Sequence, residues 1–256
     1  AAHGFTKSEV EEAIALLANA YRNAASQVNS RQSVQLAEQL SVAAHKKTIV
    51  QNPADTLAMV EGFVPDLTVD VVNAAFREAW GTGANTIHIT TKTPLENAAE
   101  TIAAAYTKSA TVAVSAPVEE ISKPFAYDSF GKPGKVVADE RISDLDVRTV
   151  RFANGVKLNI KRTDFEKGKI GFSMRAGSGR SGLPSKKPGL SVMFDYLNNA
   201  DGLGKHSIDE LQKLTAGKTV SLIMKTSDDA FVAQGSTTPN DLELQLKLLA
   251  AKTSDM

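Results

Sequence analysis

Histidine is the commonest side-chain ligand of metals in proteins, and this sequence has four: His3, His45, His88 and His206. No two of them are four residues apart, and neither His-Glu-x-x-His, His-x-x-Glu-His nor His-x-His occurs. Cysteine is absent, which excludes thiolate metal sites, disulfides and cysteine nucleophiles. We therefore predict no local metal site, and we expect the histidines to lie at the surface or at its boundary.

Residues 177–182 have the G-x-G-x-x-G spacing of a phosphate-binding loop. In a dinucleotide site, the last glycines open a helix within a βαβ unit, and the N-terminus of that helix faces the pyrophosphate. Here residues 183–187 intervene before the next predicted helix, and the preceding strand belongs to an antiparallel region. We predict a mobile loop instead of a nucleotide site.

Two further patterns would be relevant to hydrolysis. The first, the Gly-x-Ser-x-Gly string of a serine hydrolase, is absent. Asp228 and Asp229 could form a carboxylate pair, but nothing in the sequence marks a second catalytic partner. The simpler interpretation of Ser-Asp-Asp at 227–229 is a hairpin turn. The residues alone therefore identify no catalytic, cofactor-binding or metal-binding position.

The charge is balanced overall but uneven along the chain. The sequence has 29 basic and 29 acidic residues, yet residues 141–187 contain 12 basic and 4 acidic side chains. Such a region could attract an anion, a substrate carboxylate or nucleic acid. Only three aromatic residues, Phe152, Phe165 and Phe172, lie among these charges, so a solvated sheet face is favoured and no nucleic-acid partner is expected. No apolar run approaches the 18 residues that would indicate a membrane span.

The first half has mainly helical periodicity. Capping residues and apolar stripes predict helices that begin near residues 6, 31, 52, 68 and 94. The first begins with a capping box at Thr6 and Glu9. Alternating apolar and polar residues predict short strands at 85–91 and 111–115.

The second half begins with strands. Residues 147–152 and 156–161 flank Asn154-Gly155, which predicts a hairpin, and alternation in 169–175 adds a third strand to make a meander. Two helices, two strands and a last helix follow; they are expected at 188–199, 207–217, 220–224, around 231, and from 238.

This pattern predicts an α+β protein with two partial two-layer α/β sandwich subdomains, each an antiparallel sheet packed by helices. Residues 117–144 lack periodicity and are rich in proline, glycine and charge, which predicts an extended linker. We place the helix-rich end of one domain at 1–118, the linker at 119–143, and the beginning of a second domain at 144–256.

Several strings, taken in order, resemble a known family. VRFANGVKL at 150–158, FSMRAGSG at 172–179, KPGL at 187–190, GKHSIDELQ at 204–212 and DAF at 229–231 resemble the opening of a repeat unit of the pitrilysin/insulinase family of zinc peptidases. Residues 4–17 and 52–81 are similar to the helix-rich end of the preceding unit. The resemblance covers nearly the whole chain.

The resemblance implies two homologous halves that close around a peptide like a clamshell. In the active half, the helix after the third strand carries His-x-x-Glu-His, whose histidines and a distal glutamate bind zinc. Here Val192, Asp195 and Tyr196 stand at the positions of His, Glu and His. The resemblance therefore implies a central fragment: the end of the first half, the linker, and the start of a non-catalytic second half.

We expect no catalytic, cofactor-binding or metal-binding residue in this fragment. The resemblance places zinc in a catalytic half that would precede residue 1, and makes that remainder of the polypeptide and a peptide substrate the expected partners. Two alternatives stay open: a non-catalytic family member acting as a structural or partner subunit, and an unrelated binding module that uses the basic 141–187 face. The compartment, the substrate and any homo-oligomer also stay open.

Overall fold

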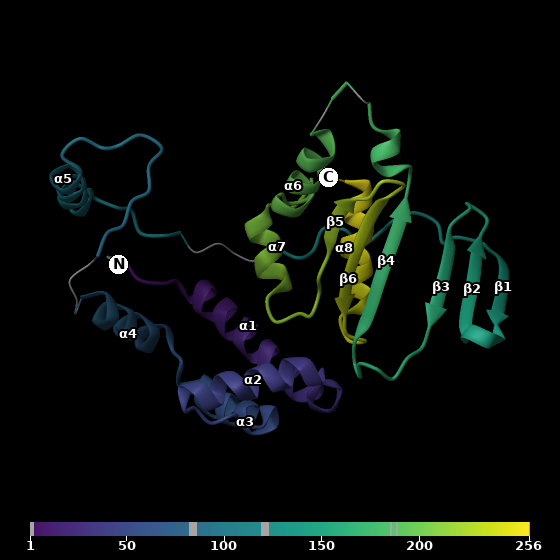
Figure 1. The fold of residues 1–256 in the computed structure, drawn as a ribbon, viewed down its shortest axis with the longest axis horizontal. Coiled ribbons are helices and arrows are strands. Elements are labelled where there is room, and N and C mark those ends of the chain that lie inside the picture. Colours follow the sequence, from purple (N-terminus) through teal and green to yellow (C-terminus); the bar gives the residue numbers. More distant parts are fainter. Residues whose placement is uncertain (1–2, 82–85, 119–122, 185, 188, 256) are drawn as a thin grey trace. The chain divides into compact units, whose positions relative to one another are not determined.

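The computed structural model describes residues 3–81, 86–118, 123–184, 186–187 and 189–255 (Figure 1). The chain forms two compact units: Ala1–Ile14 with Gly62–Ile121, and Ala15–Glu61 with Ser122–Met256. The division of the sequence at 1–118, 119–143 and 144–256 stays a prediction.

The first unit is built from helices. It contains the beginning of α1 (Lys7–Ser26), α4 (Val69–Gly81) and α5 (Ala98–Ala110). The predicted capping box is present, since the Thr6 amide donates to Glu9 Oε2 at 2.7 Å and the Glu9 amide to Thr6 Oγ1 at 3.3 Å. Buried Asn73 accepts a hydrogen bond from the Phe5 amide and donates one to the Phe5 carbonyl, which fixes the chain before α1.

Two strands predicted in this unit are absent. Residues 86–91 and 111–115 form no strand, and residue 85 lies outside the described residues. Ile87 and Ile89, whose alternation suggested a half-buried strand, are exposed. A strand needs a neighbour to satisfy its amides and carbonyls, and the described part of this unit supplies none. The helix expected from residue 94 begins at Ala98.

The second unit contains the remainder of α1, then α2 (Ser33–Lys46) and α3 (Pro53–Phe63). Asn52 caps α3 through a 3.0 Å hydrogen bond from the Ala54 amide, as its place before a proline predicts. The side chains of Asn19 and Asn23 on α1 both donate to Thr219 Oγ1, at 3.2 and 2.8 Å.

Two antiparallel sheets of three strands lie in the second unit (Figure 1). Sheet A has the order β1-β2-β3, with β1 at Val136–Ile142, β2 at Val147–Phe152 and β3 at Lys157–Lys161. Sheet B has the order β4-β6-β5, with β4 at Ile170–Ala176, β6 at Phe231–Thr237 and β5 at Ile223–Thr226.

This topology corrects two predictions. The segment predicted as an extended linker contains β1, which pairs with β2 from Val136–Phe152 to Ile142–Val147. The predicted meander does not form, because β4 pairs with β6 over seven residue pairs and not with β3. Alternation identifies a strand but not its partner, and the partner of β4 lies about 60 residues further along the sequence.

The predicted hairpin between β2 and β3 is confirmed, but its turn uses only one residue with positive φ. Gly155 has a φ of +88°, whereas Asn154 does not enter that region. The Gly155 amide donates to the Phe152 carbonyl at 3.0 Å, and the Phe152 amide donates to the Val156 carbonyl at 2.9 Å. This is the three-residue loop in which a type I turn is followed by a left-handed glycine.

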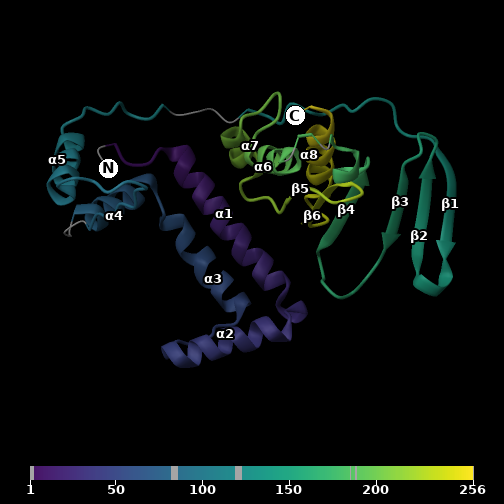
Figure 2. The same ribbon diagram turned by 45° about the horizontal axis from the view of Figure 1, so that its top comes forward.

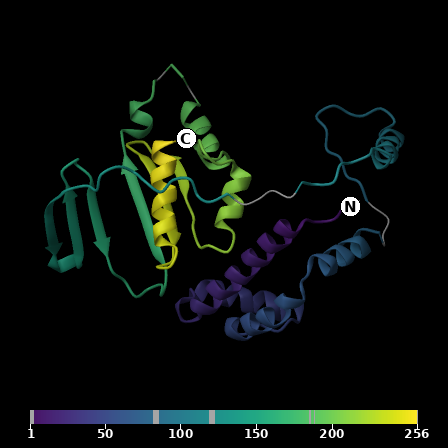
Figure 3. The same cartoon turned by 180° about the vertical axis from the view of Figure 1, so that it is seen from behind.

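Helices cover sheet B. α6 (Leu190–Ala200) packs against β5, and α8 (Leu242–Ser254) packs against β6. Figure 2 shows α6 on the β5 side of the sheet, and Figure 3 shows α8 lying over it. Between these helices, α7 (Ile208–Thr215) begins with the predicted capping box of Ser207 and Glu210. The α+β class is thus confirmed. None of the helices in the part of the chain that the structure describes is long and apolar enough to span a membrane.

Candidate functional site

The helix on which the resemblance places a zinc motif is α6. Val192 and Tyr196, at the positions of the two histidines, are each 68% exposed, and Met193 and Leu197 beside them are also exposed. Asp195, at the position of the glutamate, is half-buried and accepts a 2.6 Å hydrogen bond from Thr226 Oγ1 on β5. The outward face of α6 is therefore apolar, and its one carboxylate is directed to the neighbouring strand.

A second side chain of α6, that of Asn199, binds the backbone of β5. Asn199 Oδ1 accepts from the Met224 amide at 2.9 Å, and Asn199 Nδ2 donates to the Met224 carbonyl at 2.7 Å. In the described residues β5 is an edge strand, so the outward amide and carbonyl of Met224 have no neighbouring strand to bond. The two bonds from Asn199 take the place of that strand. Neither a charge pattern nor a motif indicates this role for Asn199, so no signal in the sequence could have identified it.

These positions do not fit a zinc ion. Valine offers no ligand atom, and one oxygen of the Asp195 carboxylate already accepts from Thr226. Within residues 3–81, 86–118, 123–184, 186–187 and 189–255, no three His, Cys, Asp or Glu side chains are grouped so that they could hold a metal ion.

The four histidines do not all lie where the sequence predicted. His3, His45 and His88 are exposed, and His3 Nε2 lies 2.7 Å from the Val114 carbonyl. His206, however, is only 3% exposed, so its predicted place at the surface or boundary was wrong. It is buried because it stacks on Phe125, with ring centroids 5.5 Å apart, and Phe125 comes from the segment predicted as a linker.

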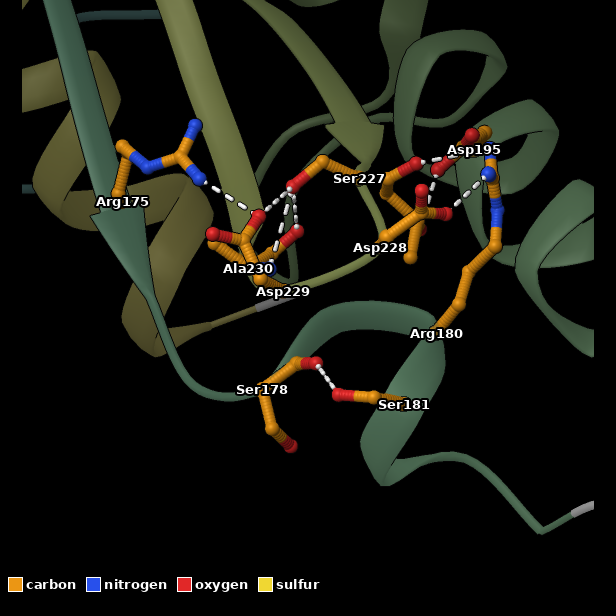
Figure 4. A network of polar contacts seen from close by, with 10 residues as sticks. Arg175, Ser178, Arg180, Ser181, Asp195, Ser227, Asp228, Asp229 and Ala230 are labelled. Atoms are coloured by element: carbon orange, nitrogen blue, oxygen red, sulfur yellow. Dashed lines mark hydrogen bonds and ion pairs between the residues drawn. The ribbon is translucent and has the colours of Figure 1, made fainter.

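The glycine-rich segment 177–182 forms a short 3₁₀ turn at Gly179–Gly182 instead of the predicted mobile loop (Figure 4). The amides of Arg180 and Ser181 donate to the carbonyls of Ser227 and Asp228, both at 2.9 Å. A phosphate would need such amides to be free. The segment therefore anchors the turn between β5 and β6, and nucleotide binding has no support in this geometry.

The two aspartates of that turn do not form a catalytic pair. Arg180 binds Asp228 at 2.8 Å, and Arg175 binds Asp229 at 2.7 Å, so each carboxylate has its own arginine (Figure 4). The Ser227 hydroxyl and then Arg175 hold the pKa of Asp229 below its usual range. Because a general acid needs a raised pKa, Asp229 is unsuited to that role.

Ion pairing also accounts for much of the basic region 141–187. At least five of its cations lie within 4.0 Å of a carboxylate oxygen: Arg141 with Asp146, Arg148 with Asp139, Lys169 with Glu166, Arg175 with Asp229, and Arg180 with Asp228. The bonds from Arg148 hold the pKa of Asp139 below its usual range. This pairing favours the interpretation of a solvated sheet face.

Comparisons with known proteins address the fold. Neither a family model nor a curated protein sequence matches the chain. The periplasmic protease PqqL from Escherichia coli is 17% identical, with a TM-score of 0.50 over 99% of this chain and 28% of PqqL. The fold is that of a segment of a protease. The ferredoxin protease FusC, solved in complex with Arabidopsis ferredoxin, is 14% identical, with a TM-score of 0.47 over 98% of this chain and 28% of FusC. The chain thus spans about a quarter of the length of each.

Proposed function

We propose that the chain is a central segment of a zinc endopeptidase of the pitrilysin/insulinase kind, and that it helps to enclose a peptide without taking part in the chemistry. The fold similarity to a segment of PqqL and the ordered strings that resemble the family support this proposal. Zinc and the activated water would belong to a catalytic half elsewhere in the parent polypeptide.

The observation that carries the proposal is the outward face of α6. Val192, Met193, Tyr196 and Leu197 are all exposed there, at and beside the positions where an active unit would present its metal ligands. Contiguous exposed apolar side chains are typical of surfaces that bind a ligand or another chain. An apolar helix face in place of a metal centre suits a wall that contacts the peptide while another unit cleaves it.

A second role follows from the same face: a non-catalytic structural or partner subunit would also present apolar side chains to a neighbouring chain. The two roles differ in what the parent polypeptide contains. An intact His-x-x-Glu-His upstream of this segment favours the peptidase, and its absence favours the structural subunit.

The first experiment uses the 256-residue chain. The chain is first exposed to zinc and then dialysed to remove unbound metal. Metal analysis is expected to find no stoichiometric zinc, and cleavage of a quenched fluorescent peptide library is expected to stay at background. Bound zinc together with chelator-sensitive cleavage would contradict the non-catalytic role.

The second experiment uses the parent polypeptide and tests the wall directly. Val192→Asp and Tyr196→Ala are expected to raise KM about fivefold with little change in kcat, because they remove contacts made equally in the ground and transition states. The matched control is Val34→Asp on α2, where the original side chain is 77% exposed and no effect is expected. An unchanged KM in both α6 variants would contradict the proposal that this face of α6 contacts the peptide.

A further inference from the structure

Residues 123–127, here called the strap, are bound to the segment 203–210 and to the residue after α8, all within the second unit. The Ala126 amide donates to His206 Nε2 at 2.9 Å. Tyr127 Oη accepts from the Lys205 amide at 2.9 Å and donates to Asp255 Oδ2 at 2.8 Å. Specific polar bonds therefore hold a stretch that the sequence predicted to be linker.

Apolar contacts reinforce these bonds. The Phe125 ring is stacked on His206 with an interplanar angle of 8°, and its centroid is 5.4 Å from that of Tyr127. Tyr127 is buried in one cluster with Leu203 and Ala251. Removing these rings from water stabilises the bound strap and keeps solvent away from the His206 ring.

The bond from Ala126 fixes the protonation state of His206. Because Nε2 accepts a hydrogen bond from an amide, it carries no proton, and the neutral ring must carry its proton on Nδ1. Nδ1 lies 3.5 Å from Glu210 Oε2. A second proton can therefore go only to Nε2, where it would point at the Ala126 N–H, so protonation removes the acceptor and places two donors face to face.

The charged groups around His206 do not restore this bond. On α7, Glu210 Oε2 lies 3.5 Å from Nδ1 and favours a cationic ring, while Oε1 of the same carboxylate binds Lys123 of the strap at 2.6 Å. Because this attraction acts at Nδ1, it does not give Nε2 back its role as acceptor. The hydrogen bond from Lys123 holds the pKa of Glu210 below its usual range. The Glu210 carboxylate is thus present on either side of a histidine titration.

The remaining neighbours oppose an added positive charge or are already engaged. Lys205 Nζ lies 4.9 Å from the centroid of the Tyr127 ring, and its positive charge disfavours a second cation nearby. Asp255 is bound to Tyr127, whose pKa is raised chiefly by burial. From α8, Lys252 Nζ donates to the carbonyls of Asp201 and Gly202.

We propose that the strap is a pH-responsive latch: protonation of His206 releases residues 123–127 from the 203–210 segment. Release would free five residues that precede β1, or up to about 17 Å of extended chain. The protonation state of His206 would then determine how many residues before β1 are free of the 203–210 segment. This inference does not depend on the proposed peptidase function, and its test measures no proteolysis.

The test follows amide hydrogen exchange of Ala126 in the 256-residue chain between pH 7.5 and pH 5.0, relative to the intrinsic exchange rate at each pH. NMR of the His206 ring in the same samples gives the pH at which it titrates. Protection of Ala126 is expected to fall about tenfold, with the same midpoint as the ring. Protection that stays constant through the ring titration, or a ring that does not titrate in this range, would overturn the proposal.

Two variants separate the latch from general acid sensitivity. In His206→Gln the side-chain oxygen can accept from Ala126 but cannot be protonated, so protection is expected to be independent of pH. His45→Gln changes an exposed histidine away from the strap and is expected to behave as the wild type. A His206→Gln chain with the wild-type pH dependence would contradict the proposal. Should this variant fail to fold, agreement or disagreement of the two wild-type midpoints decides alone.

Discussion

Sheets A and B have the same number of strands and the same antiparallel pairing, yet they are buried very differently. In sheet B, Met224, Val232 and Ala233 are buried, and α6 and α8 pack on its strands. In sheet A only Thr149 and Val150 are buried within strands, and every residue of β3 is exposed. Pairing satisfies the backbone of both sheets, but only helices that cover a sheet remove its apolar side chains from water.

The difference teaches what each sheet depends on. Sheet B combines cross-strand pairing with a covered core and with side chains that bond its edges, such as Asn199 on β5. Sheet A relies on its ladders and on side-chain pairs between its strands, such as exposed Arg148 with Asp139 and buried Thr149 with Asn159. The exposed apolar residues of β3, Leu158 and Ile160, are where a covering layer would act.

The largest expected effect is on the core of sheet B. Met224 is only 5% exposed, and Met224→Ala is expected to lower the free energy of unfolding by about 3 kcal/mol, because the deletion leaves a cavity between α6 and the sheet. Leu158 in sheet A is 44% exposed, and Leu158→Ala is expected to lower the free energy of unfolding by less than about 1 kcal/mol. Peptide-resolved hydrogen exchange in increasing urea measures both. Equal losses would show that sheet A has a covered core after all.

A smaller effect is expected at the turns. Gly179 has a φ of +57°, and a Cβ there would overlap the backbone of Ser227 and Ala230, so Gly179→Ala is expected to cost about 2 kcal/mol in sheet B. Gly155 in sheet A also has positive φ but has open space around it, so Gly155→Ala is expected to cost about 1 kcal/mol. The same exchange measurement on the β5–β6 and β2–β3 peptides compares the two destabilisations. A larger loss of stability for Gly155→Ala than for Gly179→Ala would contradict the prediction.

The smallest effect concerns surface pairs, in which the two sheets are expected to be alike. Arg148 lowers the pKa of Asp139 in sheet A, and Ser227 with Arg175 lowers that of Asp229 in sheet B. A carboxyl with a lowered pKa stabilises the fold above its ordinary pKa, and this contribution is lost as the pH falls through the lowered value. Asp139→Asn and Asp229→Asn should therefore each flatten the stability profile slightly below about pH 4.

Both pairs are exposed, so high salt should weaken them equally. Thermal unfolding from pH 6 to pH 2.5, in low and in molar salt, gives the comparison. A clearly larger change in one variant would show that its pair is shielded from solvent within its sheet.

Much of the chain was predictable because the responsible interactions are local. The boxes at Thr6 and Ser207 begin α1 and α7, and Gly155 turns the hairpin of sheet A, since each needs only residues within a few positions of one another. The resemblance likewise directed attention to α6, where Val192 and Tyr196 do lie on one exposed face.

The tertiary structure decided what depends on distant partners. It paired β4 with β6 and not β3, added β1 to sheet A from the predicted linker, and left residues 86–91 without a partner strand. It also buried His206 beneath the strap, where a residue 80 positions earlier donates to its ring. Periodicity in a sequence shows which side chains share a face, but the energy of a strand or a buried ring comes from groups that only the folded chain brings together.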